Sequence, residues 1–320
     1  MIVSLDKTLV DIKKKIKWVL KFQNKKTKIM INENQNLILP KNPRYLIARA
    51  GLHFYEEPPI SGNSGSGTIF FGGCSLKCVF CQNRDISHTA KGLNISQDDL
   101  ILLMLHLQEQ GAHNINLVTP SHYVKCLIVT LQKTKPKLKI PIVYNTSCYE
   151  NAEQLKLLDG LVDIYLPDFK YVDETIAVNF SKAKDYFPRA CTALKEMLRQ
   201  QPKNVMENGL LKKGVVVRHL VLPGQIEDTK RVLDYLSKID NIHVSLMGQY
   251  FPPIGNLPSP LNRRLTAHEY KKATEYMRLV GIKNGWTQEL SSATKDYVPD
   301  FDLNQLENLL NDLRGKNLNI

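Results

Sequence analysis

Long apolar runs are missing from this sequence of 320 residues. No stretch reaches the roughly 18 consecutive apolar residues that a membrane-spanning helix requires. The first ten residues contain Asp6 and lack an apolar core, which is not the pattern of a secretory signal. We therefore expect no membrane partner.

Cysteine is also scarce. The chain contains six cysteines, and three of them fall within eight residues. Disulfide-stapled proteins instead spread an even set of cysteines along a short secreted chain. The pattern predicts a reducing, cytoplasmic location and a metal site. The other three cysteines are isolated, and we interpret them as packing residues: Cys126, Cys148 and Cys191.

Acidic residues are few at the N-terminus. Residues 1–28 hold nine lysines against two aspartates and carry +7 of the chain's net charge of +12. Apolar residues recur at helical spacing over Thr8–Phe22, which predicts an amphipathic helix with a solvated lysine face. Docking to an acidic partner or to nucleic acid is the alternative, and nucleic acid is disfavoured because aromatic stacking residues are sparse there. We assign residues 1–47 to a lysine-rich extension.

A dense cysteine motif follows a short strand-like run. Thr68–Phe71 has strand character, and Gly72 and Gly73 permit a sharp turn after it. Three thiols then follow in C-x3-C-x2-C spacing, at Cys74, Cys78 and Cys81. The sequence thus places three metal ligands on one loop just past the end of a strand.

The number of thiols separates two kinds of metal site. Structural zinc is normally enclosed by four ligands. A [4Fe-4S] cluster is usually held by four thiolates, so three would leave one iron open to a substrate or cofactor. We favour the cluster, and a zinc loop is the alternative.

Strand-like and helix-like runs alternate over the rest of the chain. The expected strands are Thr68–Phe71, Asn114–Val118, Pro141–Tyr144, Val162–Leu166, Val215–Leu222 and Ile242–Met247. The expected helices are Asp98–Glu109 with Ser96 as N-cap, Tyr123–Leu131, Asn151–Leu158, Ala190–Arg199, Glu227–Ser237, Ala267–Leu279 and Asn304–Leu313. Nearly continuous apolar strands indicate a parallel sheet covered on both faces. We expect one α/β core of six β/α units over residues 48–282 and a C-terminal segment over residues 283–320.

Two stretches before the motif give weaker signals. Tyr45–Ala50 predicts an extended segment, whereas His53–Pro59 is stiffened by proline and does not predict regular helix. Ser61–Gly67 is rich in glycine and serine. Its glycines precede a strand instead of following one, which argues against a phosphate-binding loop and favours a flexible loop.

Polar side chains follow the expected strands, where ligands bind in parallel β/α proteins. Asp168 and Lys170 lie two residues apart just after one strand, so an extended path places both on the same side. They can pair with each other or hold the charged end of an amino acid. The alternative is a surface salt bridge without a role in binding. Arg218 and His219 are adjacent in a strand and must face opposite sides, and the sequence leaves open which of the two faces the site.

The cysteine motif, with Phe80 before its third cysteine, resembles the signature of radical S-adenosylmethionine (radical SAM) enzymes. Other stretches resemble the branch related to pyruvate formate-lyase activating enzymes, in particular its little-characterised homologues. These stretches are Ala48–Ala50, Glu56–Gly62, Gln82–Asn83, Tyr144–Thr146, Leu166–Lys170, Arg218–Gly224, Gln249–Tyr250 and Pro299–Asp302.

The resemblance implies a partial (β/α)6 TIM-like barrel that is open on one side, here with an N-terminal helical extension. It implies one [4Fe-4S] cluster held by the three cysteines of the motif, with S-adenosylmethionine bound at the open iron. An electron from the cluster would split the sulfonium to give a 5'-deoxyadenosyl radical that abstracts hydrogen. The implied contacts to S-adenosylmethionine are Phe80, Gln82, Asn83, Thr119, Asn145, Thr146, Asp168, Lys170 and Arg218.

Some positions depart from the family pattern. Thr119-Pro120-Ser121 stands where classical activating enzymes have a glycine pair and a glutamate, which puts that contact with the methionyl amine in doubt. Cys148 stands where relatives usually have glycine, and Gly248 where they often have aspartate. No cysteine precedes Cys74, so we expect a single cluster.

The resemblance implies an oxidoreductase similar to activating enzymes, which abstracts hydrogen from a glycyl residue of a partner protein. A small molecule or RNA is the alternative substrate, and a non-catalytic, metal-stabilised nucleic-acid-binding protein is the alternative class. The expected partners are an electron donor such as flavodoxin or ferredoxin and a protein substrate.

Overall fold

The computed structural model of the chain describes residues 39–288, 290 and 299–316. The helix expected over Thr8–Phe22 lies outside these residues. The described residues all belong to one compact unit, which begins at Leu39. The boundary expected after residue 47 falls inside the strand β1 (Arg44–His53), and residues beyond 282 contribute a further strand and helix. The division into an extension, a core and a C-terminal segment stays a prediction.

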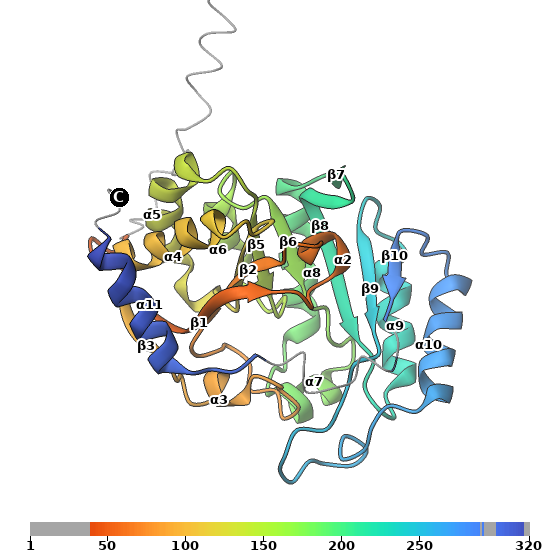
Figure 1. Cartoon of the computed structure of the whole chain (residues 1–320). Helices are drawn as coiled ribbons and strands as arrows, with labels where there is room; N and C mark the ends of the chain where they lie inside the picture. The colour runs from red at the N-terminus through yellow and green to blue at the C-terminus, as the bar shows by residue number, and fades with distance from the viewer. Residues whose placement is uncertain (1–38, 289, 291–298, 317–320) are drawn as a thin grey trace, which may run out of the picture. The chain divides into compact units, whose positions relative to one another are not determined.

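A ten-stranded sheet forms the centre of the described unit (Figure 1). Its other strands are β2 (Ser66–Phe71), β3 (Leu93–Ser96), β4 (Ile115–Val118), β5 (Ile142–Thr146), β6 (Ile164–Pro167), β7 (Val205–Glu207), β8 (Leu210–Leu220), β9 (His243–Met247) and β10 (Gly285–Thr287). The order is β10-β9-β8-β6-β5-β4-β2-β1-β3, with β7 paired to β8 alone. All neighbours from β2 to β10 along this path are parallel, whereas β1 is antiparallel to both β2 and β3. The two end strands do not pair, so the partial barrel is open, as expected.

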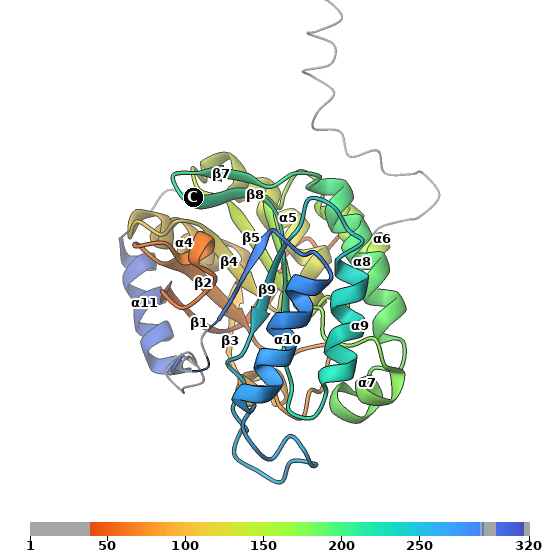
Figure 2. The same ribbon diagram turned by 90° about the vertical axis from the view of Figure 1, so that its right-hand side faces the viewer.

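Helices follow most of the parallel strands and pack along the sheet (Figure 2). They are α2 (Pro58–Ser61), α3 (Arg84–Ser87), α4 (Gln97–Glu109), α5 (Val124–Thr134), α6 (Ala152–Leu155), α7 (Glu174–Ser181), α8 (Tyr186–Gln200), α9 (Ile226–Leu236), α10 (Ala267–Leu279) and α11 (Leu303–Gly315). Short 3-10 turns add η1 (Ser121–Tyr123), η2 (Lys135–Lys137) and η3 (Lys156–Leu158). Among the described residues, none of these helices is both long and apolar enough to cross a bilayer.

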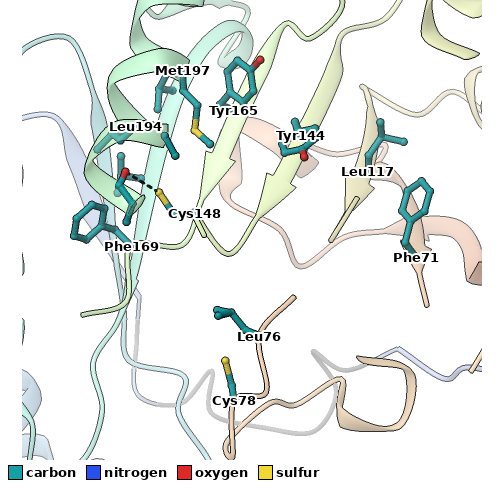
Figure 3. Packing of buried hydrophobic residues seen from close by; sticks show 14 of the residues in the cluster. Phe71, Leu76, Cys78, Leu117, Tyr144, Cys148, Tyr165, Phe169, Leu194 and Met197 are labelled. Carbon is teal, nitrogen blue, oxygen red and sulfur yellow. Dashed lines mark hydrogen bonds between the residues drawn. The ribbon is translucent and has the colours of Figure 1, made fainter. Parts of the chain in front are cut away.

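The outward face of the sheet packs against the helices. Leu117, Tyr144 and Tyr165 lie side by side on β4, β5 and β6 and are fully buried. Leu194 and Met197 of α8 belong to the same buried cluster (Figure 3). The strands are apolar because their side chains on this face are buried against helices, and removing apolar surface from water stabilises the fold.

The inward face carries a second, smaller apolar cluster. Val143, Ile164 and Val216 of β5, β6 and β8 pack there around Ile60 of α2, with Leu166 and Leu211 completing the cluster. All six are at most 2% exposed. The four-residue helix α2 therefore inserts an apolar side chain between the strands. Beyond this cluster, at the carboxyl ends of the strands, the inward residues become polar.

The six predicted β/α strands are confirmed as β2, β4, β5, β6, β8 and β9. The loop expected over Ser61–Gly67 is shorter than predicted, because Ser61 ends α2 and Ser66 and Gly67 begin β2, which leaves residues 62–65 as the turn between them. Gly67 is needed for close packing, since a Cβ there would lie 2.9 Å from the Asn114 carbonyl oxygen. Helix α2 also begins at Pro58, inside a stretch not expected to be helical; proline is tolerated in a first helical turn.

Strand β8 begins earlier than expected because it forms a hairpin with β7. The turn contains Asn208 and Gly209, both with positive φ angles, of 51° and 79°. Asn-Gly is a strong hairpin signal that the pattern of apolar residues alone did not reveal.

Candidate cofactor site

One pocket lies at the carboxyl ends of the parallel strands. All twelve residues predicted as cluster ligands or cofactor contacts line it: Cys74, Phe80, Cys78, Cys81, Gln82, Asn83, Thr119, Asn145, Thr146, Asp168, Lys170 and Arg218. They come from the cysteine loop after β2 and from the ends of β4, β5, β6 and β8. The structure thus brings every predicted position together, and their roles as ligands stay predictions.

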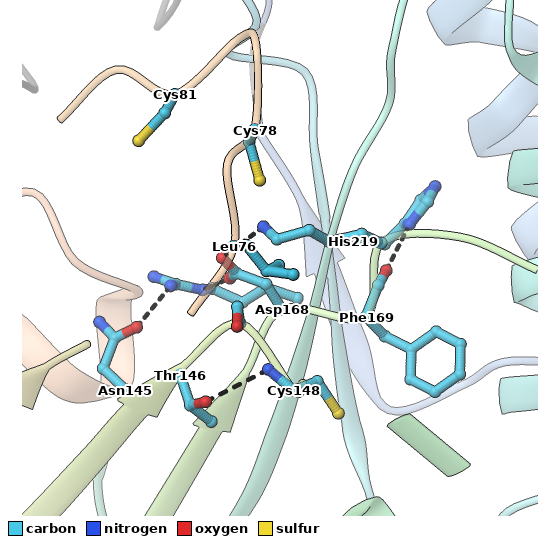
Figure 4. Close-up of polar contacts among 12 residues, drawn as sticks. Leu76, Cys78, Cys81, Asn145, Thr146, Cys148, Asp168, Phe169 and His219 are labelled. Atoms are coloured by element: carbon cyan, nitrogen blue, oxygen red, sulfur yellow. Dashed lines mark hydrogen bonds and ion pairs between the residues drawn. The ribbon is translucent and has the colours of Figure 1, made fainter. Parts of the chain in front are cut away.

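The cysteine loop is fixed by two glycines and by α7. Gly73 has a φ of 88°, which a residue with a side chain rarely adopts. A Cβ on Gly72 would lie 2.7 Å from the Lys91 carbonyl oxygen, so this glycine permits close contact within the protein. Farther along, the Val79 N–H donates to the Phe180 carbonyl oxygen of α7 over 2.8 Å. The loop is thereby held over the strand ends (Figure 4).

Each cysteine sulfur in the loop has one hydrogen-bond partner. The Leu76 N–H donates to Cys74 Sγ (3.4 Å), and the Ser181 hydroxyl donates to Cys78 Sγ (3.0 Å). Cys81 Sγ lies 3.3 Å from Ser87 Oγ. Hydrogen bonds to sulfur are one of the means by which proteins tune iron–sulfur clusters.

The thiols are the kind of donor that iron binds. Burial raises the pKa of the Cys78 thiol to about 12, although the nearby Lys170 opposes the shift. A free thiolate would therefore be unfavourable here, whereas a bound metal ion supplies the positive charge that deprotonates a coordinating thiol.

The arrangement of these donors bears on which metal site fits. In the described part of the chain, no three His, Cys, Asp or Glu side chains gather as ligands of one ion. Zinc needs its thiolates together at about 2.3 Å, whereas the thiolates of a [4Fe-4S] cluster bind separate irons. The three thiols share one pocket without gathering around a single point, which fits a cluster better than a single zinc ion.

Alternating charges cross the pocket opposite the cysteines. Lys170 Nζ lies 3.0 Å from Asp168 Oδ2, and Arg218 Nε donates to Asp168 Oδ1 over 2.8 Å. Arg218 Nη1 continues the chain to Glu56 Oε2 at 2.9 Å. The four side chains are at most 23% exposed, so they are not a solvated surface ion pair. The expectation that Asp168 and Lys170 share one side is confirmed.

Burial and pairing act against each other in this chain of charges. Burial alone would raise the pKa of Asp168, but Arg218 and Lys170 outweigh it and hold the pKa below its usual range. Burial would lower the pKa of Lys170, but the Asp168 carboxylate outweighs it and raises the pKa. Both groups thus remain charged at neutral pH.

Arg218 and His219 have separate roles. Arg218 faces the pocket, in phase with the inward Val216. His219 faces outward, with Nδ1 2.8 Å from the Phe169 carbonyl oxygen and Nε2 3.0 Å from Thr229 Oγ1 of α9. The question that the sequence left open is thereby answered: Arg218 belongs to the site and His219 to the packing between β8 and α9.

The end of β1 and the segment after it supply pocket residues that sequence reasoning did not assign to the site. His53, Tyr55 and Glu56 all line the pocket. Glu56 belongs to a stretch that resembled the activating-enzyme branch, but no local pattern indicated that it would contact Arg218, 162 residues away. Gln249, which follows β9, also lines the pocket, and its buried Oε1 has no hydrogen-bond partner among the described residues. Such an atom is a natural contact for a bound ligand.

The chain matches the family model described as the radical SAM superfamily over residues 68–236. An uncharacterized protein of Methanocaldococcus jannaschii is 34% identical over 238 residues, which cover 70% of this chain and 64% of that protein. The match therefore spans slightly less than two thirds of that relative.

Solved structures show weaker likeness. Streptococcus suis SuiB bound to S-adenosylmethionine has a TM-score of 0.48 and 14% identity, covering 73% of this chain and 52% of that chain. A domain of pyruvate-formate lyase-activating enzyme from Bacteroides vulgatus has a TM-score of 0.38 and 12% identity, covering 53% of this chain and 94% of that chain. Neither likeness is strong enough to bear on the substrate.

The match to the family model covers the cysteine loop and all the strands that supply the predicted contacts, from β2 to β8. Because the family model matches more than half of the chain, the chain belongs to the radical SAM superfamily.

Proposed function

We propose that this protein is a radical SAM enzyme whose Cys74, Cys78 and Cys81 hold one [4Fe-4S] cluster. The observation that carries the proposal is that these three thiols share one pocket with a buried, alternating set of charged side chains. When bound, the cluster and S-adenosylmethionine supply a 5'-deoxyadenosyl radical that abstracts hydrogen from a substrate.

The side chains around the pocket would bind and orient S-adenosylmethionine. Its methionyl end carries an ammonium and a carboxylate, and Asp168 and Lys170 present the complementary charges at the end of β6. Asn145 and Thr146 end β5 beside them, and Thr119 follows β4. Phe80, Gln82 and Asn83 would contact the cofactor from the cysteine loop.

We propose a glycyl residue of a partner protein as the substrate. The support is the set of sequence stretches that resemble the activating-enzyme branch, including Glu56–Gly62 and Arg218–Gly224. A small molecule or RNA is the alternative radical SAM substrate. The electron would come from a small redox protein such as flavodoxin or ferredoxin.

The test is cofactor cleavage. The protein is reconstituted with iron and sulfide without oxygen, reduced with dithionite and given S-adenosylmethionine. We expect about four irons per chain and equal amounts of methionine and 5'-deoxyadenosine, formed slowly because no substrate is present. Cys78→Ala should lose the cluster, whereas Cys126→Ala should keep the parent's iron content because Cys126 lies outside the pocket.

Three results would contradict the proposal. A normal cluster spectrum in Cys78→Ala would refute the ligand assignment. A reduced cluster that never cleaves S-adenosylmethionine would indicate an electron-transfer or structural site. One bound zinc ion without iron would instead favour the metal-stabilised binding protein.

A further inference from the structure

Glu56 reaches the pocket from outside the region that matches the family model. It lies between β1 and α2, ahead of residues 68–236, yet its carboxylate contacts residues of three parallel strands. Oε2 accepts from Arg218 Nη1 at 2.9 Å. Oε1 accepts from Asn116 Nδ2 and from Asn145 Nδ2, both at 3.2 Å. Both carboxylate oxygens are therefore in use.

These bonds orient two residues of the proposed cofactor site. Arg218 Nη2 donates to Asn145 Oδ1 at 2.8 Å, so Glu56, Arg218 and Asn145 form a closed triangle. Within it the amide of Asn145 has one consistent orientation, with its nitrogen toward Glu56 and its oxygen toward Arg218. Without Glu56, Arg218 would keep Asp168 and Asn145 as partners but lose its third anchor.

The backbone around Glu56 is held in place by the inner core. The Glu56 N–H donates to Ser61 Oγ at 2.9 Å, and Ile60 is fully buried among Val143, Ile164 and Val216. The next residue, Glu57, accepts hydrogen bonds from Ser245 Oγ of β9 and from Trp286 Nε1 of β10. The carboxylate of Glu56 is thus presented by a packed segment and not by a free loop end.

The four ion-paired side chains of the pocket alternate in charge, and their four charges sum to zero. Glu56 and Asp168 are the anions, and Arg218 and Lys170 are the cations. S-adenosylmethionine carries one net positive charge, because its sulfonium adds to a zwitterionic end, whereas S-adenosylhomocysteine lacks the sulfonium and is neutral overall. Neutralising Glu56 would make the pocket one unit more positive, whatever charge the thiolates and the cluster add, and this change disfavours the first ligand more than the second.

We propose that Glu56 is a positioning residue that orients Arg218 and Asn145 and supplies the negative charge by which the pocket prefers S-adenosylmethionine over S-adenosylhomocysteine. This inference rests on the proposed function and names a determinant of its ligand specificity.

The test measures binding of the two ligands to the cluster-loaded protein. Dissociation constants for S-adenosylmethionine and S-adenosylhomocysteine are measured by anaerobic equilibrium dialysis, without reductant so that no cleavage occurs. In Glu56→Gln we expect the constant for S-adenosylmethionine to rise about tenfold, because the sulfonium then meets one more unit of positive charge, and tenfold corresponds to about 1.4 kcal/mol. The constant for S-adenosylhomocysteine should rise by less than about threefold, because no charge repulsion is added.

Two further variants separate charge from folding. Glu57→Gln removes the neighbouring carboxyl group, which accepts hydrogen bonds from Ser245 and Trp286 and acts on Arg218 only through its charge, so it should keep most of the parent's preference. Glu56→Asp keeps the charge on a shorter stem, so it should bind both ligands more weakly yet retain the preference. If Glu56→Gln fails to load a cluster, Glu56→Asp and Glu57→Gln still decide, since loss of the preference in either one overturns the inference.

Other outcomes also overturn it. The inference is overturned if Glu56→Gln binds S-adenosylmethionine as tightly as the parent does. It is also overturned if Glu56→Gln loses affinity for both ligands by the same factor. A parent protein that loads a cluster but binds no S-adenosylmethionine would instead refute the proposed function itself, so the two failures are distinct.

Discussion

Arg218 shows how one residue depends on partners brought from distant parts of the chain. Its guanidinium contacts Asp168, Asn145 and Glu56, which belong to or follow three different strands. A buried charge without such partners would cost several kcal/mol, so removing one member of the set destabilises those that remain. The site is therefore a coupled unit, and single substitutions in it should not act additively.

Two residues of the pocket region adopt a backbone conformation that glycine prefers. Thr119 has a φ of 61° and Cys148 a φ of 62°. The family resemblance implies a glycine at the position of Cys148, and a positive φ is the conformation that glycine adopts most readily. In this chain the left-handed turn is retained with a buried side chain in its place.

His219 provides a prediction on pH. Burial lowers its pKa from 6.5 to about 4, and the imidazole is satisfied by Phe169 and Thr229 in its neutral form. The unfolded chain binds a proton below about pH 6.5 but the folded chain only below about pH 4. The free energy of unfolding should therefore fall as the pH drops from 6.5 to 4, by up to about 3 kcal/mol.

The measurement is urea unfolding of the parent and of His219→Gln, which cannot titrate in this range. The variant should be less stable at pH 7, and the gap should narrow toward pH 4.5 because only the parent loses the contribution of the histidine. A gap that stays constant over this range would show that His219 does not bind its proton more weakly in the folded state.

At the scale of elements, α4 and α11 show how local and distant signals combine. Ser96 caps α4 through a capping box with Asp99, as the sequence predicted for the N-cap. The same Asp99 carboxylate accepts two hydrogen bonds from Arg314 of α11, at 2.8 and 2.9 Å. The apolar face of α11 consists of Leu306, Leu310 and Leu313, which are all buried.

The apolar face, and not the ion pair, should hold α11 in place. Leu310 is 2% exposed, so Leu310→Ala should lower the free energy of unfolding by about 2 to 5 kcal/mol. The Arg314 side chain is 50% exposed, so Arg314→Ala should cost less than about 1 kcal/mol. Urea unfolding of the two variants compares these losses. An equal or larger loss in Arg314→Ala would show that the ion pair dominates.

The pairing of β6 with β8 places the charged residues. Ile164 and Tyr165 pair with Gly214 and Val215, and a single further bridge joins Asp168 to Arg218. Pro167 lies between them and has no N–H to offer a ladder. The bridge aligns the Asp168 carboxylate and the Arg218 guanidinium across the two strands, where they form their ion pair.

At the scale of the whole molecule, the described unit is an open sheet whose inner face is apolar at one end and polar at the other. Ile60 of α2 packs into the apolar cluster, and the cysteine loop lies over the strand ends (Figure 4). This arrangement places the pocket between the apolar cluster and the cysteine loop. Desolvation there strengthens every charge interaction that a ligand would make.

The lysine-rich residues 1–28 offer a prediction at this scale. If their lysines are only solvated, deletion of residues 1–28 should leave cofactor cleavage unchanged, since every residue of the pocket lies at or beyond His53. If they dock an acidic partner, the affinity for that partner should fall steeply with salt, because exposed charges are screened within about 10 Å at 0.1 M.

The readouts are 5'-deoxyadenosine formation with dithionite and partner binding at rising ionic strength. Loss of dithionite-driven cleavage in the truncated protein would contradict the first expectation. Partner binding that ignores salt would remove electrostatic docking.

The sequence by itself determined the features that depend on spacing along the chain. Four features follow from local spacing and are found in the structure: the position of the cysteine motif after a strand, the six β/α units, the Ser96 cap, and the shared side of Asp168 and Lys170. Periodicity specifies which residues share a face, because each strand or helix repeats its own geometry. It does not specify which face is inward when both are apolar.

Only the tertiary structure decided the rest. Val216 and Val217 are both apolar and fully buried, so the pattern of hydrophobicity did not show whether Arg218 or His219 faces the site. The strands beside β8 decide this. The sequence predicted a flexible loop over the glycine-rich stretch that leads into β2. Local pattern did not reveal that Gly67 packs closely against Asn114, which lies far along the chain. Glu56 entered the site because α2 packs its Ile60 into the inner core. Contacts of this kind depend on how distant segments fill one volume, and no local pattern encodes them.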